Sequence, residues 1–309
     1  MIELILIIFI SFFLGLFYSF LIRKFSARLQ WRIGPLVFMY KDLRSIMGIT
    51  RIIQPLYDII KLFGKKTIIP ESSRKRLFIY SPYISLIFAF ISIFFIPFSG
   101  ISLLSNVPYS LVIVSYLLIG SLLFMIIGPI ASGSPWAFIG VRREAELFLV
   151  AEFGFIISLF SMAISKNSLI LWEISIKEFN LVNITAGLLM FTSILGKLHI
   201  KPFDMSEAEA EIVAGPYTEY SGKLLGIYYL TKIFLIYDFI ALFISIFIPI
   251  NILPIYLSIP LFLIISILII FFLSIIHVLN PRYRIKNALI WYIKIISILC
   301  LINIIAMVM

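Results

Sequence analysis

Eight stretches of the sequence are each close to the roughly 20 apolar residues that an α-helix needs to cross the hydrocarbon core of a bilayer. They lie at about residues 2–22, 78–98, 108–130, 147–165, 181–199, 225–249, 255–277 and 287–308. None of them alternates with the period of two that is typical of strands in a membrane barrel, so helices are what remains to satisfy the backbone in lipid. The sequence therefore predicts an all-α, polytopic membrane protein of about eight transmembrane helices, forming one integral membrane domain over residues 1–309.

The composition excludes a soluble globular domain. Hydrophobic residues make up 62% of the chain and charged residues 13%, whereas a soluble domain is about half apolar and a quarter charged. Too few charges remain to cover a globular surface. The first apolar run begins at Met1 without a basic leader or a convincing cleavage site, so we expect a retained helix and not a signal peptide.

The basic residues are distributed unevenly between the two sides that alternate threading of eight helices would give. Residues 23–77, 131–146, 197–224 and 278–286 then share one side, and they carry 21 of the 25 Lys and Arg. The positive-inside rule makes this side cytoplasmic and places both termini outside the cell membrane. The net charge of +10 is thus explained by topology, and we expect no nucleic-acid partner.

The long inner loop at residues 23–77 contains a segment, residues 51–66, with the periodicity of an amphipathic helix. Its apolar face carries Ile52, Leu56, Ile59, Ile60 and Phe63. Its polar face carries Gln54, Asp58, Lys61 and Lys65. Two interpretations remain open: a helix that lies on the lipid head groups, and a docking surface for a soluble partner, since Pro55 and Asp58 are not needed for lipid contact.

The chain has one cysteine, Cys300, and its two histidines, His199 and His277, lie far apart at the ends of predicted helices. A lone thiol forms neither a disulfide framework nor a zinc or iron–sulfur site, and the histidines show no ligand spacing. We therefore expect no metal and no cofactor in this chain. If it belongs to a redox complex, the electrons travel through other subunits.

The acidic residues are concentrated on the predicted inner side. Five of the 15 lie between residues 202 and 222: Asp204, Glu207, Glu209, Glu211 and Glu219. Three more lie at the entry to the fourth apolar run: Glu144, Glu146 and Glu152. Asp238 stands alone within the sixth run.

Glu152 lies deepest in its predicted helix, six residues or about 9 Å beyond Glu146. A carboxylate at the bilayer centre costs on the order of 2.5–3.5 kcal/mol by insertion scales, so such residues usually face the protein interior and serve a pathway. The alternative is a structural ion pair, for instance with Lys232. Because desolvation favours the neutral acid, Glu152 is a candidate for gaining and losing a proton.

The acidic segment at residues 202–222 predicts a short helix on which Glu207 and Glu211 share a face and Glu209 points away. Like charges at this spacing repel, so the two carboxylates, if left without cations, would favour sharing one proton. The alternative is a solvated helix that is neutralised by Lys197, Lys201 and Lys223. Gly215 and Pro216 should break the helix and let the segment, with Glu219, fold back toward the membrane.

These residues resemble the signature loop of the membrane anchor subunit that respiratory complex I shares with energy-converting membrane-bound NiFe hydrogenases, the family known as subunit 1 in mitochondria. The signature loop corresponds to PFDMSEAEAEIVAGPYTEYSG at 202–222 within the inner segment 197–224. Further similar motifs are ARLQWRIGP at 27–35, IIQPLYDIIKLFGKKTIIP at 52–70, GVRREAELFLVAEF at 140–153 and NPRYRIKNALIWYIK at 280–294.

The resemblance implies a subunit without a redox centre that clamps a membrane arm to a hydrophilic arm and begins a chain of charged residues for ion movement. The implied pathway residues are Glu144, Glu146, Glu152, Asp204, Glu207, Glu209, Glu211, Glu219, Lys232 and Asp238. The expected docking residues are Arg32, Gln54, Asp58, Arg143, Arg282 and Arg284. The implied partners are NiFe large-subunit-like and small iron–sulfur subunits, which would carry the NiFe site and the clusters, and other membrane subunits, including antiporter-like ones.

Two departures from the complex I pattern favour the hydrogenase-type branch. The RIGP motif continues as LVFMYKDLRSIMGITRII, and Lys232 stands where complex I versions often carry a glutamate. Both weaken the case for quinone binding. Two alternatives remain: the same subunit in a quinone- or phenazine-reducing complex, and a stand-alone cation transporter, which the lack of an internal repeat disfavours. The transported ion, H⁺ or Na⁺, stays open.

Overall fold

The computed structural model describes residues 2–32, 34, 52–98, 103–176, 180–213 and 215–308. Every one of the eight apolar runs contains a helix in these ranges. The helices are α1 (Ile2–Leu29), α4 (Lys75–Ser92), α5 (Ser110–Ile130), α6 (Pro135–Lys166), α8 (Leu181–Lys197), α10 (Gly222–Phe247), α11 (Ile255–Leu279) and α12 (Ile285–Val308). Most of the segment after RIGP that departs from the complex I pattern lies outside the described residues.

The prediction of an all-α membrane protein is confirmed, and the predicted count of about eight spans is roughly consistent with the structure. Six helices in the described part of the chain are long and apolar enough to cross a membrane: α1, α5, α6, α10, α11 and α12. The other two are shorter, with 17 residues in α8 and 18 in α4. All the regular elements described are helices.

Helix α6 begins twelve residues before the apolar run that predicted it, at Pro135 instead of residue 147. Proline is favoured at the first position of a helix because its fixed φ suits the helix and its missing N–H is not needed there. The charged residues that follow, Arg142 to Glu146, are good helix formers. The extension makes Glu144 and Glu152 parts of one continuous helix.

The short elements lie at the two ends of the bundle. They are α3 (Gln54–Phe63), α7 (Leu171–Ile176), α9 (Glu209–Ile212) and the 3₁₀ turns η2 (Gly215–Tyr217) and η3 (Ile250–Ile252). Helix α3 is the predicted amphipathic helix. Its Ile59 is buried against Leu16 of α1 and Ile233 of α10, whereas Ile60 on the neighbouring stripe is exposed.

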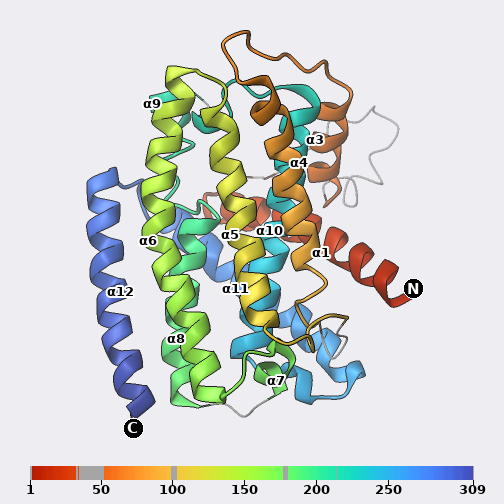
Figure 1. The fold of residues 1–309 in the computed structure, drawn as a ribbon, viewed down its shortest axis with the longest axis vertical. Coiled ribbons are helices and arrows are strands. Elements are labelled where there is room, and N and C mark those ends of the chain that lie inside the picture. Colours follow the sequence, from red (N-terminus) through yellow and green to blue (C-terminus); the bar gives the residue numbers. More distant parts are fainter. Residues whose placement is uncertain are drawn as a thin grey trace.

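The helices α4, α5, α6 and α8 run roughly along the long axis of the molecule, and α1 crosses them at a steep inclination (Figure 1). Helix α10 lies at the centre, where it contacts α1, α3, α4 and α8. It is the most deeply buried of the six long apolar helices described. Helix α12 packs on the outside of α6 and α8. Helix α9 lies at one end of the bundle and α7 at the other (Figure 1).

The segment between α8 and α10, residues 198–221, folds back into the end of the bundle, as the sequence predicts. Its side chains Phe203, Ile212 and Tyr220 are buried, while Val213 is exposed. The phenol of Tyr220 stacks on Phe78 of α4 with 4.1 Å between ring centroids. We call residues 198–221 the inner loop, because it corresponds to the predicted cytoplasmic side.

The inner loop approaches α6 most closely at Gly140, so Gly140→Ala is expected to lower the stability of the chain by roughly 1–3 kcal/mol. A Cβ atom there would lie 2.7 Å from the backbone nitrogen of Pro216 and 2.8 Å from the carbonyl carbon of Gly215. Backbone atoms of a tight turn cannot yield as a flexible side chain does. Thermal unfolding of the purified chain in detergent measures the effect.

Gly64→Ala is the matched control, because a Cβ atom at Gly64 would meet nothing closer than 3.7 Å. Helix propensity alone favours alanine over glycine by about 1 kcal/mol. A loss of stability at Gly140 but not at Gly64 therefore reports the close contact between α6 and the inner loop. Equal unfolding temperatures for the two variants would contradict it.

Candidate functional site

Three pairs of acidic and basic side chains lie between α6, α8, α10 and the inner loop. They are Glu152 with Lys197, Glu144 with His199, and Glu207 with Lys232. We call these six residues the inner cluster. Each pair joins two different elements, so the fold, and not sequence proximity, brings the partners together.

Lys197 ends α8 and donates a hydrogen bond from Nζ to Oε2 of Glu152 on α6. The Lys197 side chain is 0% exposed and that of Glu152 is 11% exposed. The rings of Phe148, Phe155 and Phe239 surround the ammonium group, with Nζ 5.4, 4.3 and 5.6 Å from their centroids. Ring faces attract a cation, so the carboxylate and the aromatic cage both stabilise the buried charge.

His199 follows α8 by two residues and places Nε2 3.4 Å from Oε1 of Glu144 on α6. Its other ring nitrogen, Nδ1, lies 3.2 Å from Oγ of Ser206 in the inner loop. Burial alone would lower the pKa of the imidazole, but the carboxylates of Glu144 and Glu207 together outweigh burial and raise the pKa above its ordinary value. The ring therefore holds a proton more readily than a free histidine does.

Lys232 of α10 donates a hydrogen bond to Oε1 of Glu207 in the inner loop. Burial alone would raise the pKa of Glu207, but the charges of Lys232 and His199 outweigh burial and lower it. The ammonium also lies 4.8 Å from the ring centroid of Tyr217. Burial and the neighbouring carboxylates of Glu144 and Glu207 raise the pKa of the Tyr217 phenol, which therefore keeps its proton.

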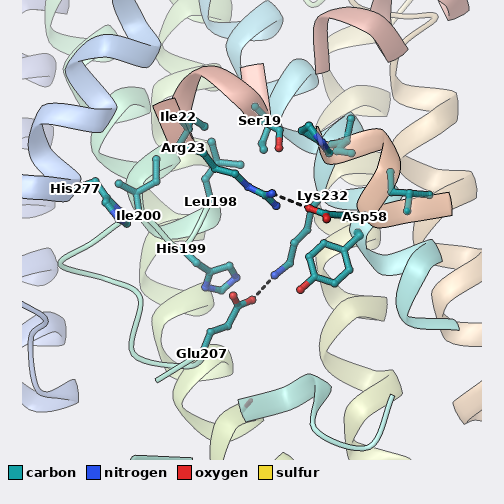
Figure 2. Close-up of a pocket in the computed structure, with 15 residues that line it drawn as sticks. Ser19, Ile22, Arg23, Asp58, Leu198, His199, Ile200, Glu207, Lys232 and His277 are labelled. Atoms are coloured by element: carbon teal, nitrogen blue, oxygen red, sulfur yellow. Dashed lines mark hydrogen bonds and ion pairs between the residues drawn. The ribbon is translucent and has the colours of Figure 1, made fainter. Parts of the chain in front are cut away.

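A cavity of about 300 Å³ opens beside the Glu207–Lys232 pair, between α1, α3, α10 and α11. Figure 2 shows His199 and Lys232 on either side of Glu207 in its wall. On the wall that α1 and α3 form, Nη1 of Arg23 donates a 2.8 Å hydrogen bond to Oδ2 of Asp58. This ion pair joins the amphipathic helix to the first transmembrane helix.

Two smaller cavities lie next to the first one, toward the other pairs. A cavity of about 100 Å³ shares His199, Glu207 and Lys232 with the first and adds Lys197. A third, of about 10 Å³, is lined by Glu144, Lys197 and His199. Because these cavities share lining residues, they are neighbours, and together they are bordered by all the members of the inner cluster except Glu152, which contacts Lys197.

Two other acids of the inner loop, Asp204 and Glu211, form separate ion pairs. Asp204 accepts a 2.7 Å hydrogen bond from Arg282, and Glu211 accepts one of 2.7 Å from Arg143. The hydrogen bond from Arg143 lowers the pKa of Glu211. On α6, Glu146 accepts a 3.2 Å hydrogen bond from Arg142, one turn earlier.

Two pairings considered from the sequence are not found in the structure. Glu207 and Glu211 are not an unpaired couple that would share a proton, because each has its own cation and α9 begins only at Glu209, so that the two carboxyls do not lie on one helical face. The buried partner of Glu152 is Lys197 and not Lys232, so Lys197 also does not neutralise the loop acids. The side chain of Glu209 lies outside the described part of the structure.

Glu219 and Asp238 lie apart from the inner cluster. Glu219 is half-exposed, and no described residue forms an ion pair with it. Asp238 is wholly buried in α10, where Oγ of Ser92 donates a 2.7 Å hydrogen bond to Oδ2. Its Oδ1 has no hydrogen-bond partner among the described residues. Neither residue lines the three cavities.

The predicted docking residues fall into two groups. Asp58, Arg143 and Arg282 are engaged in the ion pairs described above, and Gln54 donates a 3.2 Å hydrogen bond to Asp58. Arg32 and Arg284 are exposed. The second group is therefore the more accessible one, whereas Asp58 belongs to the wall of the cavity beside the Glu207–Lys232 pair.

Sequence reasoning missed Lys197, His199 and Arg23 as members of the site. His199 has no ligand spacing, yet its position at the end of a predicted helix places it where α8 enters the inner loop. Lys197 carried a usable signal, because it is a lysine at the end of an apolar run directly before the acidic segment. Arg23 gave no signal beyond its charge at the end of the first apolar run.

The NADH dehydrogenase family model matches residues 2–308. A homologous subunit of the NADH-quinone oxidoreductase of Pelagibacter ubique is 31% identical over 212 residues, which are 67% of this chain and 61% of that protein. Chain 1 of the NADH-ubiquinone oxidoreductase of Cyanidium caldarium is 32% identical over 215 residues, 67% of this chain and 59% of that protein. This chain spans about three fifths of the length of these curated relatives.

A solved structure with a similar fold comes from the membrane-bound sulfane sulfur reductase, an archaeal respiratory membrane complex. The TM-score is 0.86 with 24% sequence identity, and the match covers 99% of this chain and 98% of that chain. At this level of identity the likeness concerns the fold alone. It extends over all the helices described above.

Proposed function

This chain belongs to the NADH dehydrogenase family, and we propose that it is the membrane anchor and coupling subunit of an energy-converting, NiFe-hydrogenase-like oxidoreductase complex. In this role it holds no redox centre. It links electron transfer in a hydrophilic arm to the translocation of protons or sodium ions through its buried glutamates. The observation that carries the proposal is the inner cluster, with three acid–base pairs next to neighbouring cavities, the first of which borders the amphipathic helix.

The arrangement suits coupling because each pair contains a group that can accept a proton and a group that can release one. An electron that reaches a partner at this end of the bundle adds negative charge there, and Coulomb attraction then favours protonation of the nearest groups. Glu207 and His199 line the cavity that opens beside the amphipathic helix. The energy of electron transfer would thus be converted into a change of protonation state inside the membrane domain.

The fold also suits an anchor. Exposed Arg32 and Arg284 offer cations to the NiFe large-subunit-like and small iron–sulfur subunits, which would hold the metal centres. The exposed apolar faces of α11 and α12 offer surface to lipid or to other membrane subunits, including antiporter-like ones. We place the chain in the cell membrane with both termini outside, from the distribution of its basic residues.

A second candidate is the corresponding subunit of a complex I-like quinone or phenazine oxidoreductase. The cavity of about 300 Å³ between α1 and α3 favours it, since this volume is at the lower end of the range for ligand pockets. The names of the curated relatives point the same way. Against it, the polar wall of the cavity is occupied by the Arg23–Asp58 and Glu207–Lys232 ion pairs.

Purification of the intact complex from its native membranes distinguishes the candidates. Nickel and iron in the complex without a bound quinone would support the hydrogenase-like assignment. A bound quinone or phenazine without nickel would support the second candidate. A chain that purifies alone and moves cations by itself would contradict both and would favour a stand-alone transporter.

Arg284→Glu is expected to release the hydrophilic subunits from the membrane without unfolding this chain. Arg284 is exposed, and reversing its charge at a docking surface would place like charges together at a cost of several kcal/mol. Arg76→Glu is the matched control, because Arg76 is also exposed but lies outside the predicted docking set. The fraction of hydrophilic subunits that remains with washed membranes is the measurement, and equal retention for both variants would contradict the docking role.

A further inference from the structure

Lys197 pairs with Glu152 and lines a small cavity together with Glu144, and both carboxyl groups have an unused acceptor. Its ammonium binds Oε2 of Glu152, and Oε1 of that carboxyl has no hydrogen-bond partner among the described residues. The same is true of Oε2 of Glu144, whose other oxygen faces His199. A buried carboxylate oxygen without a donor is unfavourable, so Glu144 offers the ammonium a second binding position.

The two carboxyl groups lie on the same stripe of α6 with an aromatic ring between them. Glu144, Phe148 and Glu152 are spaced four residues apart, which places them on one face over about 12 Å of helix. The ring centroid of Phe148 lies 5.4 Å from Nζ of Lys197. A cation that moves from one carboxylate to the other therefore passes an aromatic face that attracts it.

A small cavity lies on the Glu144 side of Lys197. It is lined by Glu144, Phe148, Gly196, Lys197 and His199, among others, and has a volume of about 10 Å³. Lysine carries its charge on a flexible four-carbon stem, so its ammonium can turn into such a space without moving the backbone. The space is thus lined both by Lys197 and by the residue that carries the free acceptor.

We infer that Lys197 is a mobile counterion that exchanges between Glu152 and Glu144 and thereby couples proton binding at Glu152 to proton release from His199. The inference rests on the proposed function, because it supplies one step of the proton transfer through the inner cluster. Lys197 acts as a positioning residue in this step. It keeps its own proton and changes which carboxylate it neutralises.

The charges balance in both states. In the first state, ionised Glu152 pairs with the Lys197 ammonium, and ionised Glu144 pairs with protonated His199. In the second state, Glu152 has gained a proton, the ammonium pairs with Glu144, and His199 has lost its proton. The net charge of the four residues is zero before and after, so the buried site never holds an uncompensated charge, which would be costly.

The surroundings of His199 give the released proton a direction. The charged groups that face the ring are Glu144, Glu207 and Lys232, and the hydroxyl of Ser206 faces Nδ1. Glu144 supports the charged imidazole only while Lys197 is elsewhere. When the ammonium takes Glu144, the cavity shared with Glu207 is the open side of the ring.

A double-mutant cycle in the intact complex tests the exchange. Glu152→Gln and Glu144→Gln are each expected to assemble with near wild-type thermal stability, because either change leaves one carboxylate for Lys197. The double variant Glu144→Gln/Glu152→Gln removes both and is expected to lose assembly, far beyond the sum of the single effects. Glu219→Gln, the same chemical change at a half-exposed residue without a described ion pair, is the control.

The titration of His199 provides a second readout that a purely structural lysine would not affect. The infrared band of the His199 imidazole is identified as the band that is absent in the His199→Gln complex. In Glu152→Gln the ammonium occupies Glu144, so the imidazole should titrate at a lower pH than in the wild-type complex. In Glu152→Gln/Lys197→Met the carboxylate returns to His199, and the titration should return toward the wild-type midpoint.

The inference is overturned if Glu152→Gln alone abolishes assembly, since Lys197 would then have no second partner. Purely additive effects in the cycle, or the same His199 midpoint in all these complexes, would also overturn it. Neither readout depends on ion transport. If the wild-type complex fails to move ions during electron transfer while the cycle is non-additive, the proposed function fails and the exchange of Lys197 stands.

Discussion

Lys197→Met is expected to destabilise the folded chain by roughly 3–5 kcal/mol and to abolish assembly of the complex. Methionine preserves contacts with Phe148, Phe155 and Phe239 but removes the cation that neutralises Glu152. The carboxyl group of Glu152 would then be buried without a counterion. The effect is large because the Lys197 side chain is 0% exposed, so water cannot replace it.

The measurement is the thermal unfolding of the chain in detergent, together with the amount of complex recovered from membranes. Lys294→Met is the matched control, because it removes an exposed lysine from α12. Its effect should be small, within about 0.5 kcal/mol, as for other surface changes. Equal stability of the two variants would mean that Glu152 does not need the Lys197 charge, and the ion pair would not be a determinant of the fold.

The transmembrane helices could be predicted from the sequence because lipid imposes one strong rule. A segment that crosses the bilayer must satisfy its own backbone, so a run of about 20 apolar residues predicts a helix. The predicted boundaries were wrong where charged residues continue a helix beyond the membrane. Helix α6 begins at Pro135 because arginine and glutamate form helices well, although their polarity ended the apolar run.

The pairing of the buried charges could not be predicted from the sequence. The depth of Glu152 follows from its position in an apolar run, and the structure does bury this residue. Its partner depends on how α6, α8 and α10 are rotated against one another, which a pattern within one helix does not specify. Lys197 and Lys232 both looked available, and only the packing of the helices assigns Lys197 to Glu152 and Lys232 to Glu207.

The inner loop illustrates a second limit. Its acidic spacing predicted a helix with Glu207 and Glu211 on one face, but the helix there is one turn long and begins after Glu207. The conformation of this segment is instead determined by tertiary contacts, which bury Phe203 and Tyr220 in the bundle. His199 enters the site for the same reason. The structure of this segment is thus determined by the surfaces against which it folds.

Glu207→Gln is expected to leave the complex assembled but to reduce ion movement per electron by roughly two orders of magnitude. This is the lower end of the rate loss that follows when a group that donates or accepts a proton is removed. Glutamine keeps the size and hydrogen bonding of the side chain and removes the titrating group. Assembly persists because Lys232 is 28% exposed and borders the cavity of about 300 Å³, so water can solvate it when its anion is lost. This differs from the dry site of Lys197.

The pH dependence of the wild-type complex should agree with this role. The pKa of Glu207 in the folded chain lies below its ordinary value, because Lys232 and His199 outweigh the effect of burial. The ion pair therefore stabilises the fold above the ordinary pKa of a glutamate, and this contribution is lost as the pH falls through the lowered pKa. At neutral pH the carboxylate is ionised and able to accept a proton.

Glu211→Gln is the matched control, since Glu211 lies four residues further along the inner loop and pairs at the surface with Arg143. Both variants lose one carboxylate from the same segment, but only Glu207 lines the cavities beside the inner cluster. Electron transfer and ion movement are to be measured in the same proteoliposomes. If both variants keep wild-type coupling, ions do not pass through the inner cluster, and the acid–base pairs serve only to hold α6, α8 and α10 against the inner loop.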